Sequence, residues 1–168
     1  MYSRDEILNY RCPRWGDFPK LDLYMDQAVS FIEENVRMFY ANGQPKPVTS
    51  TMINNYVKQR IVPSSRKKRY GRDHLAYFYV IFLLKSALSL VDISDALTFF
   101  NKRKLTPEMF DLFCDEIEAA LATAFGGEPT ERASETEGIA VMRGFTLAFA
   151  YTLLARSHIA AGENEKKA

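Results

Sequence analysis

The residues best able to do chemistry in this sequence are basic side chains clustered between Asn35 and Arg72. This window contains no Asp or Glu. The chain has 22 Lys and Arg against 21 Asp and Glu, a net charge of +1, and nine basic residues in the window leave −8 for everything outside it. Such segregation creates an electric field on one face, and the commonest polyanion attracted by a basic face is nucleic acid. The nine are Arg37, Lys46, Lys58, Arg60, Arg66, Lys67, Lys68, Arg69 and Arg72.

Within this window, the stretch from Thr49 to Arg72 has the composition of a DNA-reading element. A short polar helix, capped by Thr49 or Ser50 and ending near Gln59, is followed by a basic turn over residues 64–72. Asn and Lys side chains on such a helix can reach base edges in a major groove, while basic side chains of a turn neutralise phosphates. We assign Tyr56 to either packing or a phosphate contact. The expected DNA-binding residues are Thr49, Ser50, Thr51, Asn54, Asn55, Tyr56, Lys58, Arg66, Lys67, Lys68, Arg69 and Arg72.

Other chemistries lack the residues they need. His74 and His158 have no Cys, His or carboxylate at ligand spacing, which favours structural or surface roles and predicts no metal site. The sequence has no nucleophile motif, no phosphate-cradling glycine loop and no paired catalytic carboxylates, so we expect neither an enzyme nor a cofactor. Cys12 and Cys114 lie in unrelated contexts, which predicts unbridged thiols in a reducing cytoplasm, with Cys114 buried.

Hydrophobic periodicity and helix-start signals predict an all-α fold, with a two-stranded wing across the basic turn as the one exception. Residues 1–20 form an aromatic arm that should dock on the body. The helix over 73–88 is apolar nearly all round, as expected of the central helix of a domain. The predicted helices cover residues 22–40, 49–59, 73–88, 90–100, 107–125 and 134–161.

Capping signals mark several of these boundaries. Ser89 with Asp92 and Ser134 with Glu137 have capping-box spacing, and Thr106 precedes Pro107 at a helix start. The sequence divides into an amino-terminal arm, helix and DNA-binding region over 1–104 and a carboxy-terminal helical module over 105–168. The tail after residue 162 is expected to be disordered.

The run from Thr51 through Tyr70 and on to Phe100 resembles the winged helix-turn-helix of the MerR class of bacterial transcription regulators. That class has a Thr-Leu-Arg-Tyr-Tyr recognition helix, a Gly-Leu step, a Pro, a wing ending in Arg-Tyr, an apolar helix and a short helix that starts with Ser. The usual Arg and Gly are replaced here by Asn54 and Arg60. The matching positions are Met52, Ile53, Asn54, Asn55, Tyr56, Ile61, Pro63, Arg69, Tyr70 and Ser89.

Three longer segments are more specific. PRWGDFPKLDLYMDQ, TSTMINNYVKQ and KKRYGRDHLAYFYVIFLLK are similar to a bacterial family known as domain of unknown function 1836, over most of residues 10–100. The resemblance implies a MerR-like DNA-binding fold and cytoplasmic regulation, without a ligand or target gene. The expected function is therefore a sequence-specific double-stranded DNA-binding transcriptional regulator. A helical protein-binding adaptor that uses the same scaffold is the alternative.

The last two helices have three interpretations. They form a homodimer interface through residues 105–161, they enclose a small-molecule pocket as a metabolite-sensing module, or they complete the core of the monomer. Small residues from Gly138 to Ala148 recur about one turn apart and allow close helix approach. No membrane span is expected, because the longest charge-free apolar runs, 75–84 and 144–155, fall short of the roughly 20 residues required. The pocket would be lined by Met142, Phe145, Phe149 and Tyr151.

Overall fold

The computed structural model describes residues 3–40, 47–101, 105–127 and 135–165, and these residues are helical with no β-strand among them. The predicted all-α class is confirmed. Two isolated β-bridges, Leu23 with Tyr70 and Arg66 with Arg69, stand where a two-stranded wing was predicted. The helices are α1 (Arg4–Leu8), α2 (Met25–Val36), α3 (Ser50–Lys58), α4 (Arg72–Lys85), α5 (Leu90–Asn101), α6 (Pro107–Phe125) and α7 (Glu137–Glu165), with 3-10 turns at Trp15–Asp17 and Arg37–Phe39.

The chain forms two compact units. One unit is Pro13–Leu112, and the other combines Met1–Cys12 with Phe113–Ala168. The division differs from the expected one between residues 104 and 105. The first twelve residues group with the carboxy-terminal helices, and the observed boundary after Leu112 lies within α6. The first unit carries 15 Lys and Arg against ten Asp and Glu, a net charge of +5, and therefore leaves −4 for the second.

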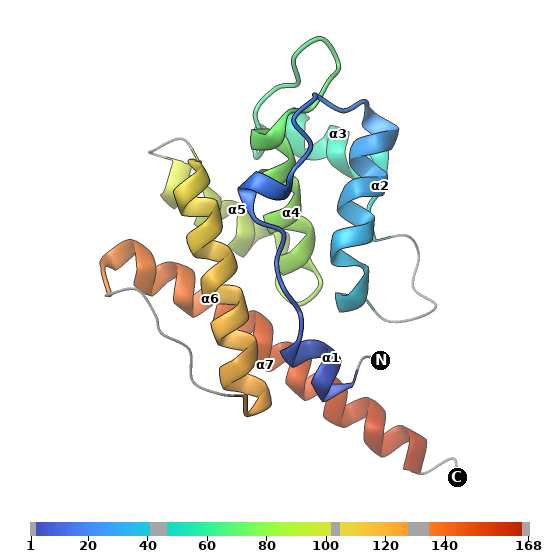
Figure 1. Cartoon of the computed structure of the whole chain (residues 1–168), viewed down its shortest axis with the longest axis vertical. Coiled ribbons are helices and arrows are strands. Elements are labelled where there is room, and N and C mark those ends of the chain that lie inside the picture. Colours follow the sequence, from blue (N-terminus) through green and yellow to red (C-terminus); the bar gives the residue numbers. More distant parts are fainter. Residues whose placement is uncertain (1–2, 41–46, 102–104, 128–134, 166–168) are drawn as a thin grey trace. The chain divides into compact units, whose positions relative to one another are not determined.

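The core of the Pro13–Leu112 unit is α4, as its composition predicts. Every residue from His74 to Leu84 is buried. Helices α2 and α5 both pack on α4, and α3 packs on α2 (Figure 1). Because α4 is covered on several sides, it is the fixed frame on which α3 and the following turn are mounted.

The part of the aromatic arm after Cys12 packs within this unit, in agreement with the prediction that the arm docks, whereas residues 1–12 group with the other unit. Phe18 is buried, and the Trp15 ring stacks edge-on against Phe110 at a centroid distance of 6.2 Å. The backbone N–H of Trp15 donates to Asp111 Oδ1 at 2.8 Å. The short helix α1 was not predicted, although Ser3 and Glu6 form a capping box at its start.

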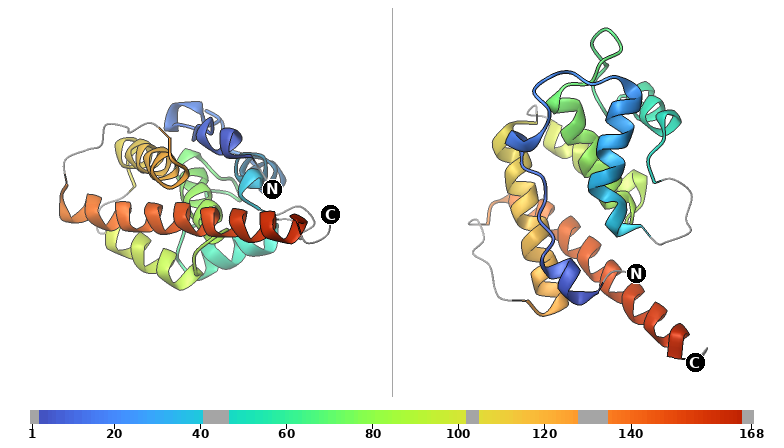
Figure 2. Two further views of the ribbon diagram at one scale, coloured as in Figure 1. Left: turned by 90° about the horizontal axis from the view of Figure 1, so that it is seen from below. Right: turned by 45° about the vertical axis from the view of Figure 1, so that its right-hand side comes forward.

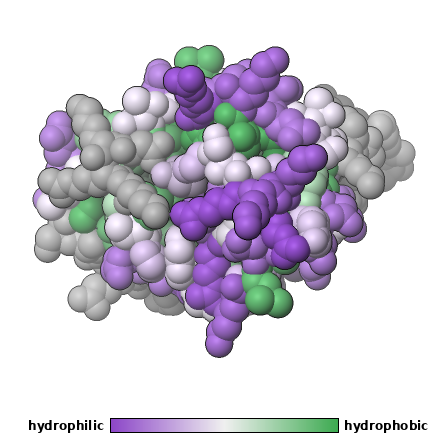
Figure 3. All heavy atoms as spheres, turned by 90° about the horizontal axis from the view of Figure 1, so that it is seen from above, coloured by the Kyte–Doolittle hydropathy of each residue, from purple (hydrophilic) through white to green (hydrophobic). Residues whose placement is uncertain are grey.

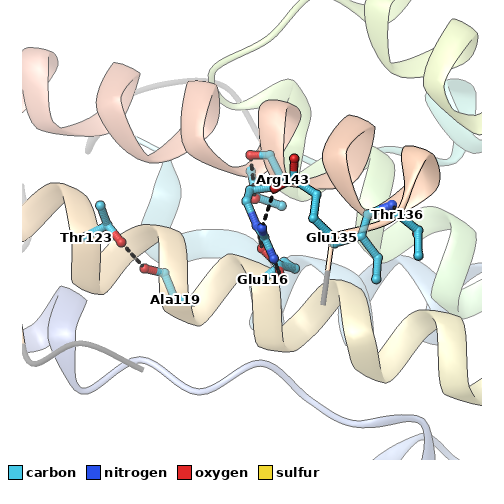
Figure 4. Close-up of polar contacts among 8 residues, drawn as sticks. Glu116, Ala119, Thr123, Glu135, Thr136 and Arg143 are labelled. Atoms are coloured by element: carbon cyan, nitrogen blue, oxygen red, sulfur yellow. Dashed lines mark hydrogen bonds and ion pairs between the residues drawn. The ribbon is translucent and has the colours of Figure 1, made fainter. Parts of the chain in front are cut away.

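The second unit is built from α1, α6 and the long helix α7. Arg143 of α7 forms two hydrogen bonds with Glu116 of α6, at 3.0 and 2.9 Å, and a third with Glu135 at 2.8 Å (Figure 4). The Glu116 hydrogen bonds raise the pKa of the Arg143 guanidinium. Glu116 is buried, and its carboxylate is compensated there by the Arg143 guanidinium. At the end of α6, Arg4 Nε donates to the Phe125 carbonyl at 2.8 Å.

Helix α7 is a long unbroken rod (Figure 2), and its exposed surface includes large apolar side chains. After Ala150 none of its described side chains is buried, and Tyr151 and Ile159 are exposed. Among the described helices, one segment, Glu137–Gly162, has the length and composition to cross a membrane, and 22% of its most apolar window is buried. The apolar segment of α7 is therefore longer than the run of 144–155 taken from the sequence. Length and composition alone do not distinguish a spanning helix from an apolar contact surface.

Most helix boundaries agree with the sequence signals. Ser89 caps α5 by accepting from Asp92 N–H at 3.2 Å, and Thr106 caps α6 in the same way through Met109. Helix α7 begins after Thr136 rather than Ser134, because the Thr136 hydroxyl accepts from Ile139 N–H. Ser134 itself lies outside the described residues, as do 41–46, 102–104 and 166–168 of the expected loops and tail. Helix α7 continues three residues past the expected end of order at 162.

Candidate nucleic-acid interface

The start of α3 and its outer face are as the sequence predicts. Thr49 is the N-cap, and its hydroxyl accepts from Met52 N–H at 3.2 Å. Ile53 is buried while the next two residues, Asn54 and Asn55, are exposed. Side chains three or four residues apart share one face of a helix, so the exposed polar positions form a continuous stripe. The stripe consists of Thr51, Asn54, Asn55 and Lys58, with Ser50 exposed beside it.

An unusual residue occupies the end of α3. Arg60 has a φ of +61°, in the left-handed region that favours glycine. The N–H of Arg60 donates to the Val57 carbonyl at 3.0 Å, and the N–H of Ile61 donates to the Tyr56 carbonyl at 3.0 Å. These two bonds are the Schellman pattern, in which glycine is the usual residue. Arg60, which stands where the MerR pattern has Gly, therefore holds a left-handed conformation at a cost in backbone strain.

The basic turn that follows is also strained. Arg66 and Arg69 exchange backbone hydrogen bonds of 3.1 and 2.9 Å, which leaves a two-residue turn at Lys67 and Lys68. These residues have φ values of +49° and +60°, as a type I′ turn requires. Such turns favour Asn and Gly, so two lysines at these positions have a higher conformational free energy than those residues would. In the described part of the chain, the non-glycine residues with positive φ are Arg60 and these two lysines.

Two sets of contacts fix the base of the turn. The His74 ring is buried, its Nδ1 accepts from Gly71 N–H at 3.3 Å, and its Nε2–H donates to the Ser64 carbonyl at 3.1 Å. Leu23 and Tyr70 exchange backbone hydrogen bonds of 2.9 Å each, which joins the turn to the segment before α2. The turn is therefore held at both ends by a histidine from α4 and by a backbone bridge.

The loop that carries the turn projects beyond the ends of α3 and α4 (Figures 1 and 2). Viewed from that side, hydrophilic side chains gather over the middle of the surface (Figure 3). Arg66, Lys67, Lys68 and Arg69 are exposed. Two acids lie close to Gly71 at the base of the turn. A Cβ added to Gly71 would lie 2.9 Å from Asp22 Oδ1 and 3.2 Å from Asp73 Oδ1. The positive field is therefore concentrated toward the tip.

Two of the expected DNA-binding residues have other partners. Tyr56 is only 3% exposed, and its ring packs on Phe82 at 5.4 Å. Of its two assigned roles, packing is correct, because a buried hydroxyl cannot reach a phosphate. Arg72 is half-buried, and its Nε donates to the Phe18 and Pro19 carbonyls at 3.1 and 3.3 Å. Arg72 therefore fastens the aromatic arm to α4 rather than facing the surface of the turn.

The roles of two residues of this region were not predicted from the sequence. His74 was assigned a structural or surface role without a partner, since nothing local indicates that its ring spans the loop from Ser64 to Gly71. Tyr24 was not considered, although its ring lies beneath the Arg69 guanidinium at 4.4 Å. The pairing signal is weak in sequence because the two residues are 45 positions apart.

Two other expectations are addressed by the described residues. None of the His, Cys, Asp and Glu side chains among them forms a group of three that could hold a metal ion. The suggested small-molecule pocket is not assembled as expected: Phe149 is fully buried and Tyr151 is exposed. Two residues apart on a helix, they face nearly opposite directions. Met142 is buried and Phe145 half-buried, and Cys114 is buried as predicted.

Comparison with known proteins gives one match. The model of the family described as Domain of unknown function (DUF1836) matches residues 13–123. This match extends beyond the expected end near residue 100 and takes in most of α6. No curated protein and no solved structure matches the chain. Because the family model covers well over half of the chain, including all of α2 to α5, this protein belongs to the DUF1836 family.

Proposed function

We propose that this protein is a sequence-specific double-stranded DNA-binding transcriptional regulator with a MerR-like helix-turn-helix core. Helix α3 enters the major groove and the turn over residues 64–70 contacts flanking phosphates. Asn54, Asn55 and Lys58 read base edges, because Asn can pair in a bidentate manner with adenine and Lys with guanine. The exposed hydroxyls of Ser50 and Thr51 contact the backbone near the start of the helix.

The observation that best supports this proposal is the placement of positive charge at strained positions beside the polar stripe of α3. Arg60, Lys67 and Lys68 each hold a left-handed conformation that glycine would adopt more cheaply. Backbone strain of this kind persists at functional sites where the side chain is needed. A basic side chain at all three positions, rather than the usual Gly or Asn, is explained if each neutralises a phosphate.

The proposal includes a homodimer formed through residues 105–161. A single short recognition helix reads few bases, and two-fold proteins commonly bind palindromic sites. The exposed apolar side chains of Tyr151 and Ile159 on α7 support a contact surface there. Ala140, Gly144, Ala148 and Ala155 are also exposed on α7, and their spacing of seven or eight residues per two turns suits close packing of a second helix.

Two substitutions distinguish recognition of bases from binding of the phosphate backbone. Asn54→Ala removes a base contact and should relax or abolish preference at one position of the site, whereas Lys67→Ala should weaken binding to all duplexes alike. With about five phosphates neutralised per half-site, log affinity should fall with log salt at a slope on the order of −9 for the dimer. Fluorescence anisotropy with labelled duplexes over a salt series measures both quantities. Equal behaviour of the two variants would show that α3 does not read bases.

The competing function is an adaptor in which the same basic face binds an acidic protein. The net charge of +5 on the Pro13–Leu112 unit favours any polyanion and does not by itself select DNA. Affinity capture that recovers a protein but no DNA, together with a monomer in sedimentation, would support the adaptor and contradict the regulator.

A further inference from the structure

An exposed aromatic and cationic pair lies at the side of the basic turn. The Arg69 guanidinium carbon is 4.4 Å from the centroid of the Tyr24 ring, and Arg69 Nη2 donates to the Tyr24 hydroxyl oxygen at 2.6 Å. Tyr24 is 51% exposed, and Arg69 is exposed. The stacking and the hydrogen bond together hold a long, flexible side chain in one orientation at the surface.

The backbone fixes the position of Tyr24 independently of its side chain. Tyr24 is the N-cap of α2, and its N–H donates to Gln27 Oε1 at 2.9 Å. The preceding residue, Leu23, is joined to Tyr70 by two backbone hydrogen bonds, and Tyr70 follows Arg69. The two side chains therefore meet because their backbones are neighbours in a bridge, not because two mobile side chains happen to touch.

The hydrogen bond between the two side chains leaves donors directed elsewhere. Because the Tyr24 oxygen accepts from Arg69, the hydroxyl hydrogen can donate to a further acceptor. The guanidinium has five N–H groups in a planar fork, of which one points to Tyr24. A phosphate has several anionic oxygens that can accept from both groups at once, and such charge-assisted bonds are the strong ones.

We propose that Tyr24 and Arg69 together bind one phosphodiester group of a nucleic-acid backbone, with Tyr24 also positioning Arg69. This inference rests on the proposed function and adds the start of α2 as a third part of the interface, beside α3 and the turn. A nucleic-acid backbone fits better than a free anion. The pair is open to solvent, with few donors to enclose a small ion, while Lys67 and Lys68 next to it can hold the adjoining backbone.

The test measures duplex affinity over a salt series for Tyr24→Phe, Tyr24→Ala, Arg69→Ala and the double variant Tyr24→Phe with Arg69→Ala. Tyr24→Phe keeps the ring and loses the hydroxyl, so affinity should fall roughly fivefold to tenfold with the salt slope unchanged. The duplex affinity of Tyr24→Ala should fall further, because this variant also loses the ring. Arg69→Ala should also make the slope shallower by about 0.9 per half-site. The double variant should bind like Arg69→Ala, because the two groups act as a unit.

Thr98→Val is the matched control, since it likewise removes one exposed hydroxyl and lies in α5, outside the proposed interface. It should bind duplex like the unmodified protein. Thermal unfolding of each variant checks folding, which Tyr24 substitutions should preserve because the side chain is exposed. Titration with inorganic phosphate, followed by the amide NMR signals of residues 24 and 69, tests a small anion as the ligand.

The outcomes are separable. If the unmodified protein binds no duplex, the proposed function itself fails. If the unmodified protein binds duplex and both Tyr24 variants bind it as tightly as the unmodified protein does, the DNA proposal stands and the role of Tyr24 is refuted. If Tyr24→Phe abolishes saturable phosphate binding but leaves duplex binding unchanged, the pair is a small-anion site and the assignment to nucleic acid is overturned.

Discussion

Replacing Lys68 by Gly should stabilise the protein while weakening its binding to DNA. The φ of +60° at Lys68 costs an L-residue about 1–2 kcal/mol, and Gly removes that cost. Glycine also adds about 0.5–1 kcal/mol of unfolded-chain entropy, which opposes the gain. The net stabilisation expected for Lys68→Gly is therefore about 0.5–1 kcal/mol, or roughly 1–4 °C in Tm for a chain of this size.

The same substitution removes one phosphate contact from each half-site. For a dimer, the salt slope should become shallower by about 2, with a corresponding loss of affinity for every duplex. Lys68→Ala is the matched control, because it removes the same charge but keeps a Cβ at the strained position. It should lose the same affinity without the gain in stability.

Urea unfolding and anisotropy titrations on the three proteins measure these effects. A Lys68→Gly variant no more stable than Lys68→Ala would show that the turn is not strained as its φ values indicate. A Lys68→Gly variant that binds duplex as tightly as the unmodified protein would refute the argument that the charge is retained for phosphate contact.

Three further substitutions test other parts of the account. Tyr56→Phe should change stability by less than about 1 kcal/mol and leave DNA affinity unaltered, since the buried hydroxyl has no hydrogen-bond partner among the residues that the structure describes. His74→Ala should cost about 2–4 kcal/mol by urea unfolding and increase amide hydrogen exchange in the basic turn, because both ends of the loop lose their side-chain partner. Arg143→Met should cost about 3–5 kcal/mol by removing the guanidinium that pairs with the buried Glu116 carboxylate, and adding Glu116→Leu should restore most of that loss.

Local signals in the sequence predicted the helices well because their causes are local. Ser89, Thr106 and the glycine after α6 act within four residues of the boundaries they set, and Gly126 has the left-handed φ of +67° expected beyond a helix end. The start of α7 was misplaced by two residues because Ser134 and Thr136 offer competing caps. Local spacing cannot choose between them.

The part of the site that depends on long-range contacts was not predictable. The polar face of α3 follows from periodicity, but the burial of Tyr56 depends on Phe82 of another helix. The engagement of Arg72 with the arm and the stacking of Arg69 on Tyr24 join residues more than 40 positions apart. The charge pattern of the sequence therefore predicts the basic surface, but only the structure shows which of its cationic side chains are exposed.

The MerR-like core stays a proposal, of which the structure confirms the all-α class. The order of helices is as expected, but the wing is reduced to one bridged pair around a two-residue turn. A wing that short offers few donors of its own. This is consistent with recruitment of Tyr24 from the start of α2 and with basic residues at each strained position.

The central claim is that α3 reads sequence in double-stranded DNA. The most direct measurement is selection of bound duplexes from a random library by the unmodified protein and by Asn54→Ala, followed by sequencing. We expect enrichment of one motif with two related half-sites, and loss of preference at one position of each half-site in the variant. Retention of all duplexes alike, or of none, would contradict the claim.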